Sequence, residues 1–137
     1  MKYLMLIVLV CVTTIAQAEP AVMVGGWSKH MVTDGDYNSN HKIVAIEYKN
    51  ILIGRFTNSY YRESYIAAYA IHRQWSDVKG SLYVGAVRGY RGCYSDNKLS
   101  TTLCPVFIPS LSYTKYSIQP AVLVLGEAVV VAVKYQF

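Results

Sequence analysis

The chain has 137 residues and a formal net charge of +5 at pH 7, and this length suits one domain rather than two. Its 13 Lys and Arg residues are scattered and form no long run of like charges, so a nucleic-acid-binding tail is not expected. Tyrosine contributes 13 residues. Because Tyr and Trp concentrate where a protein crosses the interface between membrane and water, their abundance favours a membrane protein.

The first 18 residues have the pattern of a bacterial secretory signal peptide. Lys2 gives a positive start, residues 4–15 are mostly apolar, and Ala16-Gln17-Ala18 forms a cleavage site of small residues. We therefore expect residues 1–18 to be removed and residues 19–137 to form the β-barrel domain described below. The alternative is a retained anchor, but the apolar run is shorter than the ~20 residues of a spanning helix.

Beyond residue 18, hydrophobic periodicity predicts β-strands. The sequence contains no heptads and no long stretch of helical period. Segments of about eight to twelve residues, rich in Val, Ile, Tyr and Ala, alternate with turns, which is typical of an antiparallel meander. Eight strands are predicted, at residues 21–31, 41–48, 51–57, 64–75, 81–92, 106–113, 117–125 and 127–137.

The connections between these strands alternate in length. The first, third and fifth are polar loops and the seventh is a short bend, whereas the even-numbered connections are tight turns. Long connections on one side and short turns on the other are typical of outer-membrane barrels. A closed barrel also leaves no backbone group unpaired in lipid. The predicted fold class is therefore all-β, an eight-stranded antiparallel transmembrane β-barrel of the bacterial outer membrane.

The last strand carries the clearest sign of a lipid-facing wall. One face is apolar and ends in aromatic residues, and the other is small and then polar. An edge strand of a periplasmic sandwich is the alternative, but it would not readily explain so apolar a face with so little charge. The apolar face holds Val129, Val131, Val133, Tyr135 and Phe137, and the other holds Ala128, Val130, Ala132, Lys134 and Gln136.

Two cysteines flank the fifth connection. Cys93 and Cys104 would remain after removal of the signal peptide, and an even cysteine count in an exported chain suggests a disulfide. Closing this loop would stabilise the fold by about 3 kcal/mol. No histidine or further cysteine lies near the pair in the sequence, so we expect neither a metal nor another cofactor.

Several stretches resemble the PagP-type lipid A palmitoyltransferases, eight-stranded outer-membrane barrels that move a palmitoyl chain from a phospholipid to lipid A. They are FTNS at 56–59 with IAAY at 66–69, CPVFIPSLSY at 104–113 and KYQF at 134–137. The first is similar to the family's catalytic Asp-Ser pair and the strand after it. The second is similar to a strand start with two spaced prolines, and the third to the closing residues.

The resemblance implies a catalytic site formed by His30, Asn58 and Ser59. Ser59 matches the family's serine, Asn58 stands where the family has aspartate, and His30 is the best match for its histidine. Acyl transfer needs a nucleophile or activated hydroxyl, a base and donors for the oxyanion. We expect Ser59 to be the nucleophile or to bind the acceptor. Asn58 cannot act as a base, but it can donate to an oxyanion or orient His30.

A carboxylate that orients the histidine is expected from a neighbouring loop, since a catalytic histidine is usually held by one. Asp34, Asp36 and Glu63 are the candidates.

The site residues also have structural interpretations. Asn58 and Ser59 are residue types that turns favour, and His30 could be a polar residue of the interface. His41 is a rival histidine at the outer end of the second strand. His72 is expected to fill the lumen near the opposite end of the barrel.

The prolines suggest a path for lipid. Pro105 and Pro109 flank the start of the sixth predicted strand, and Pro120 interrupts the seventh. Proline removes a ladder donor and is confined to strand starts, bulges and weak edges. The resemblance implies that weakly paired seams near prolines admit lipid sideways into the lumen. Simple strand termination is the alternative.

These expectations combine into one functional hypothesis. The protein is expected to be an outer-membrane acyltransferase that moves a palmitoyl chain from a phospholipid donor to lipid A in lipopolysaccharide. It would act in the membrane as a monomer, without nucleic acid. The alternative is a non-catalytic small barrel that modifies the cell surface, through adhesion, serum resistance or phage exclusion.

Overall fold

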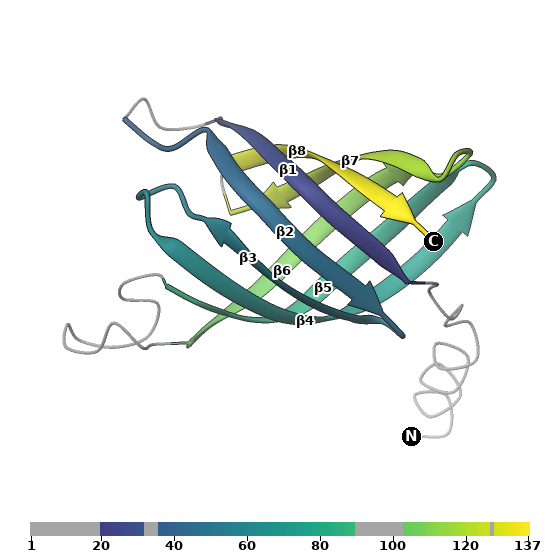
Figure 1. Ribbon diagram of the computed structural model, residues 1–137, viewed down its shortest axis with the longest axis horizontal. Helices are drawn as coiled ribbons and strands as arrows, with labels where there is room; N and C mark the ends of the chain where they lie inside the picture. The colour runs from purple at the N-terminus through teal and green to yellow at the C-terminus, as the bar shows by residue number, and fades with distance from the viewer. Residues whose placement is uncertain (1–19, 32–35, 90–102, 127) are drawn as a thin grey trace, which may run out of the picture.

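The computed structural model describes residues 20–31, 36–89, 103–126 and 128–137 (Figure 1). Each strand pairs with its neighbour in the chain, and β1 also pairs with β8, so the sheet closes into an antiparallel barrel. Among the described residues there is no helix long and apolar enough to cross a membrane. The strands are β1 (Ala21–His30), β2 (Asn40–Tyr48), β3 (Ile51–Thr57), β4 (Glu63–Trp75), β5 (Val78–Arg88), β6 (Leu103–Tyr113), β7 (Ile118–Leu125) and β8 (Ala128–Gln136).

The prediction of eight antiparallel strands in a closed barrel is confirmed. The starts of β5 and β6 both lie three residues earlier than expected, and β5 ends at Arg88 rather than at residue 92. The turn before β5 contains only residues 76–77, because Ser76 takes a positive φ of 52° and reverses the chain at once. Gly80 then pairs with Arg73 inside the sheet, where the Trp75 ring occupies the space of a Cβ.

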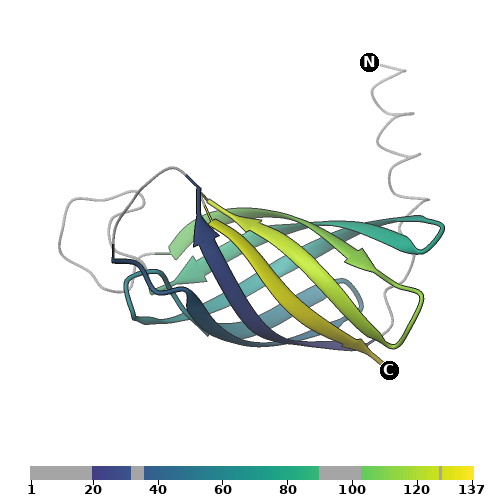
Figure 2. The same ribbon diagram turned by 90° about the horizontal axis from the view of Figure 1, so that it is seen from above.

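The two ends of the barrel differ in their connections. Residues 49–50, 76–77 and 114–117 form short turns at one end, which we name the turn end. Residues 31–39, 58–62, 89–102 and 126–127 connect strands at the other, which we name the loop end. The first residue of β1, Ala21, pairs with the last residue of β8, Gln136, at the turn end. Figure 2 shows the C-terminus at this end. The expected alternation of connection lengths is confirmed.

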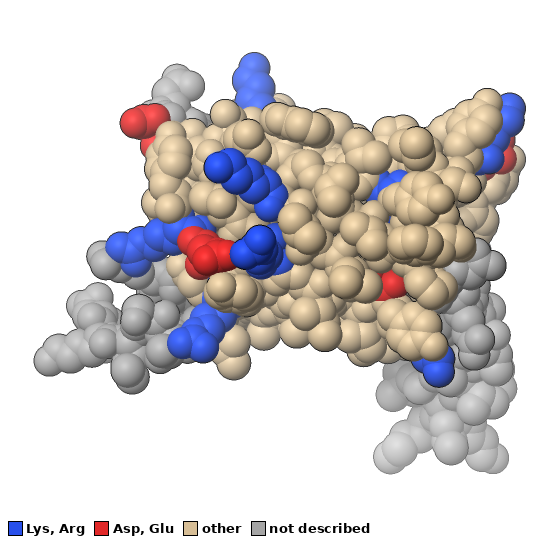
Figure 3. Space-filling view, viewed as in Figure 1, with Lys and Arg blue, Asp and Glu red and all other residues tan. Residues whose placement is uncertain are grey.

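Residues alternate between an apolar outer wall and a packed lumen. On β4 every second residue from Ser64 to His72 is buried, whereas the residues between them are exposed. On β8 the outward Val131 and Tyr135 are exposed, and the inward Val130 and Ala132 are buried. The expected faces of β8 are confirmed. In Figure 3 the middle of the wall is almost free of charged residues.

The lumen near the turn end is filled by a buried polar cluster. Glu47 accepts hydrogen bonds from Tyr83 at 3.0 Å and from Lys134 at 2.9 Å. Its other carboxylate oxygen lies 2.6 Å from His72 Nε2, and Ser81 lies 2.7 Å from His72 Nδ1. His72 therefore fills the lumen as expected. Because these polar groups hydrogen-bond to one another, their interactions offset the large cost of removing them from water.

Cys104 is buried at the start of β6. Cys93 lies outside the described residues, as do the expected signal peptide and Asp34. The disulfide between Cys93 and Cys104 therefore stays a prediction.

Candidate functional site

A bulge in β1 decides which way His30 points. Ala21 and Met23 face the lumen, and strict alternation would turn Lys29 inward and His30 outward. Gly25 and Gly26 instead adopt φ angles of +97° and +99°, and the register shifts between Gly25 and Trp27. A φ near +100° is readily available to glycine alone, and an extra residue in one strand reverses the inward and outward alternation. The bulge therefore places His30 on the lumen side.

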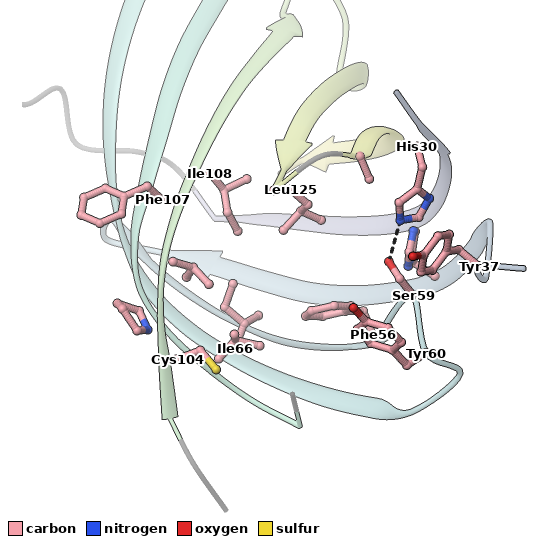
Figure 4. Close-up of a pocket in the computed structure, with 16 residues that line it drawn as sticks. His30, Tyr37, Phe56, Ser59, Tyr60, Ile66, Cys104, Phe107, Ile108 and Leu125 are labelled. Atoms are coloured by element: carbon pink, nitrogen blue, oxygen red, sulfur yellow. Dashed lines mark hydrogen bonds between the residues drawn. The ribbon is translucent and has the colours of Figure 1, made fainter. Parts of the chain in front are cut away.

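His30 and Ser59 meet at the loop end. His30 Nε2 lies 3.1 Å from Ser59 Oγ, although the residues come from β1 and from the connection after β3 (Figure 4). The Tyr37 ring stacks on the imidazole with the ring centroids 4.5 Å apart and an angle of 22° between the planes. Tyr60 in turn packs edge-on against Tyr37. The histidine is thus held by an aromatic stack on its face and by a hydroxyl at its edge.

Asn58 organises the connection instead of contacting His30. Its side chain is fully buried. Nδ2 donates to Ser64 Oγ at 3.0 Å and to the Gly89 carbonyl at 3.1 Å. Oδ1 accepts from the backbone amides of Tyr60 at 2.9 Å and Arg62 at 3.2 Å. Both amide hydrogens are therefore engaged, and Asn58 acts here as the frame that presents Ser59.

His41, the rival histidine, is engaged in structural hydrogen bonds. Its Nδ1 lies 2.7 Å from the Thr57 carbonyl, and Nε2 lies 2.6 Å from Ser28 Oγ. A carbonyl only accepts, so Nδ1 carries a hydrogen, and Ser28 can donate to Nε2 of the neutral ring. Asn38 adds a bond to the Asn58 carbonyl at 3.2 Å. These contacts tie the start of β2 to the end of β3.

Two of the candidate carboxylates bind other partners. Asp36 accepts a hydrogen bond from the Tyr61 hydroxyl at 3.3 Å, and desolvation together with this carboxylate raises the pKa of Tyr61. Glu63 forms an exposed ion pair with Arg55 at 3.2 Å. Within residues 20–31, 36–89, 103–126 and 128–137, no carboxylate is hydrogen-bonded to His30. The stacked Tyr37 ring orients the imidazole instead.

The histidine–serine pair stands at the mouth of an apolar cavity of about 600 Å³. The cavity continues into the lumen past Phe56, Ile66 and Val87, as Figure 4 shows for the first two. It also reaches the wall between β6 and β7, at Phe107 and Leu125. A hydroxyl beside an imidazole at the opening of an apolar chamber is an arrangement suited to chemistry on the polar end of an acyl chain.

The wall is open to this cavity because β6 and β7 barely pair. Only three residue pairs join them, Ser110 to Leu123, Leu111 to Val122 and Ser112 to Ala121. Continuing this register would pair Pro109 with Val124 at one end and Pro120 with Tyr113 at the other. Because proline has no N–H to donate, each proline coincides with an end of the ladder. The expected weak pairing beside Pro109 and Pro120 is confirmed.

Three further residues support the site, and the sequence does not predict this role. Tyr37 and Asn38 lie in an expected polar loop and His41 is the rival histidine, yet together they hold the imidazole and the connection that carries Ser59. The polar run at residues 33–40 resembles any surface loop, and their contacts with residues about 20 positions away are not visible in the sequence.

The fold and the site define a closed eight-stranded barrel with a histidine–serine pair at the loop end of an apolar lumen. No protein-family model matches the chain, and no curated protein matches it either. Among the described residues, no three His, Cys, Asp or Glu side chains lie together in a way that could hold a metal ion.

Proposed function

We propose that the barrel spans the bacterial outer membrane. Its exposed wall carries large apolar side chains on every strand, including Ile46, Ile53, Leu111 and Val131. A soluble monomer rarely exposes so continuous an apolar surface, whereas a closed barrel satisfies its backbone bonds internally and can face lipid. Tyr48, Trp75 and Tyr135 lie near the turn end, where an interfacial girdle would be expected.

Within that membrane we propose that the protein is a lipid A acyltransferase of the palmitoyl-transferring kind. The observation that carries this proposal is the 3.1 Å contact between His30 and Ser59 at the mouth of the apolar cavity. An acyl chain in the cavity would bury its methylene groups, at about 0.8 kcal/mol each. Its ester would then lie at the cavity mouth beside the hydroxyl.

The seam between β6 and β7 supplies a path for the phospholipid donor. Beyond Ser110 toward the loop end, β6 and β7 have no register partners in each other, and the cavity is lined there by Pro105, Phe107 and Leu125. Opening this part of the wall breaks few backbone hydrogen bonds. A donor chain could therefore pass from the membrane into the lumen sideways, without its polar head crossing the apolar interior.

The geometry supports a two-step transfer. Ser59 Oγ attacks the ester carbonyl of the donor, and its proton passes to His30 Nε2. The ester bond breaks, and the departing lysophospholipid oxygen takes that proton, which leaves the acyl group on Ser59. An acceptor hydroxyl of lipid A then gives its proton to His30 and attacks the acyl-serine. Ser59 regains the proton, and the acyl ester of lipid A leaves.

Mass spectrometry of lipid A from cells that express the protein tests the proposal. We expect lipid A to gain one acyl chain with the wild-type protein and none with Ser59→Ala or His30→Ala. Ser117→Ala is the matched control, because Ser117 lies in a turn at the opposite end of the barrel. Cys104→Ser is unsuitable because it would alter the expected disulfide. Unchanged lipid A with a correctly assembled wild-type barrel would favour the non-catalytic alternative. Free fatty acid without acylated lipid A would show that water is the acceptor and would contradict the transferase.

A further inference from the structure

Two arginines on the outside of the barrel lie at the edge of the apolar wall that is nearer the loop end. Arg55 on β3 and Arg88 on β5 are exposed, and Tyr65 on β4 is paired with both of them. We name these three residues the arginine row. Because neighbouring strands lie about 4.8 Å apart, the two arginines are about 10 Å apart along the row.

The level of the row follows from the residues next to it. Two positions closer to the turn end, the same strands present Ile53, Ala67 and Ala86 in register. The charged row is therefore the first outward row beyond uninterrupted apolar surface. In the proposed membrane orientation it lies at the level of the headgroups, where arginine and tyrosine can keep their polar ends hydrated.

The charge of the row is available to a ligand. Arg55 pairs with Glu63, but both side chains are more than half exposed, at 63% and 53%. Such pairs contribute about 0.2–1 kcal/mol and exchange readily. Lys42 and Arg62 are further exposed cations at the loop end. Figure 3 shows blue side chains gathered at this end of the wall, with fewer red ones.

We propose that the arginine row binds the phosphoryl groups of lipid A on the outer face of β3–β5, and so positions the acceptor; this inference rests on the proposed function. Guanidinium groups bind phosphate oxygens in a bidentate manner. Two of them about 10 Å apart suit a headgroup with two separate phosphates, whereas the single phosphate of a phospholipid engages one. The Tyr65 ring between them offers a flat apolar surface and a hydroxyl to a sugar.

The connection from β3 to β4 joins the row to the catalytic pair. Arg55 lies four residues before Ser59 on the same chain segment, and Glu63 and Tyr65 begin the strand that follows it. A glycolipid held by its phosphates outside β3–β5 would therefore place its sugar next to the opening where Ser59 lies.

The test measures binding without turnover. In the Ser59→Ala background, lipid A with two phosphates and the same lipid A without phosphates are titrated against the protein in zwitterionic detergent. We expect Arg55→Gln with Arg88→Gln to weaken binding of the phosphorylated lipid by about tenfold or more, since charge-assisted bonds are lost. Binding of the dephosphorylated lipid should not change. Glu63→Gln should strengthen binding of the phosphorylated lipid, because it releases Arg55 and removes a repelling charge.

Arg73→Gln is the matched control, since Arg73 is an exposed arginine of the same wall near the turn end. It should leave binding unchanged, and heat-dependent gel mobility checks that every variant is folded. Equal binding by the double variant and its parent, or an equal loss with Arg73→Gln, would overturn the proposal. The two proposals fail separately. Arginine-dependent binding without acyl transfer by the wild type sinks only the proposed function, and transfer without arginine-dependent binding sinks only the row.

Discussion

Lys134 on β8 and Glu47 on β2 form an ion pair of 2.9 Å inside the lumen, although 87 residues separate them in the chain. The pair joins the last strand to the second across the interior, and Tyr83 and His72 complete its hydrogen bonds. The cluster lies near the turn end. It fills the lumen there and links β2, β4, β5 and β8 through hydrogen bonds.

Removing one member of this pair should destabilise the barrel strongly. Glu47→Gln leaves the Lys134 ammonium buried without its counter-ion, so we expect a loss of about 3–5 kcal/mol in the free energy of unfolding. Urea-induced unfolding in lipid vesicles measures this free energy for each variant. Glu63→Gln, which breaks the exposed pair with Arg55, should cost at most about 1 kcal/mol. Glu47→Met with Lys134→Met should cost less than Glu47→Gln alone, and a larger loss in the double variant would contradict the assignment of a buried charge pair.

Tyr37 is expected to position His30 through stacking. Tyr37→Ala removes the ring that holds the imidazole, and aromatic pairs contribute about 0.5–1.5 kcal/mol. We therefore expect acyl transfer to slow by about tenfold or less, in kcat rather than in KM for the donor. Tyr37→Phe keeps the ring and should retain most of the rate. If Tyr37→Phe is as slow as Tyr37→Ala, our interpretation is wrong, because the hydroxyl would then be the important group.

Asn58→Asp should lower both the stability and the activity of the protein, although it introduces the residue found in the resembled family. The carboxylate cannot donate to the Gly89 carbonyl, and a buried acceptor loses its partner, at a cost of about 1–3 kcal/mol. We expect lower thermal stability and lower acyl transfer. A gain in activity with Asp would instead show that Asn58 occupies the place of a missing catalytic carboxylate.

The seam between β6 and β7 should control access of the donor. Phe107→Cys with Gly126→Cys places two thiols across its unpaired part, and a short cleavable maleimide cross-linker should close it. We expect transfer from phospholipid to fall sharply and to return after cleavage. Leu111→Cys with Val122→Cys cross-links positions that are already paired, so it should leave the rate unchanged. Equal inhibition in both variants would argue against a lateral path.

Much of the fold is readable in the sequence because a barrel wall imposes a period of two on every strand. The alternation of Val129, Val131 and Val133 with Ala128 and Ala132 predicts both faces of β8 correctly. Pro109 and Pro120 predict a weak seam, since proline cannot donate to a ladder whatever its surroundings. These features depend only on local chemistry and on the alternation of side chains.

The site depends on contacts that local patterns do not contain. Strict alternation would leave His30 outside, and only the bulge at Gly25 and Gly26 turns it toward Ser59. The structural role of Asn58 is not readable in the sequence, because its amide donates to Ser64 and Gly89, which lie 6 and 31 residues away. The sequence by itself determined a closed wall of eight alternating strands. Tertiary structure decided how this histidine meets the serine, because β2 pairs with both β1 and β3 and so holds His30 and the connection after β3 near each other at the loop end.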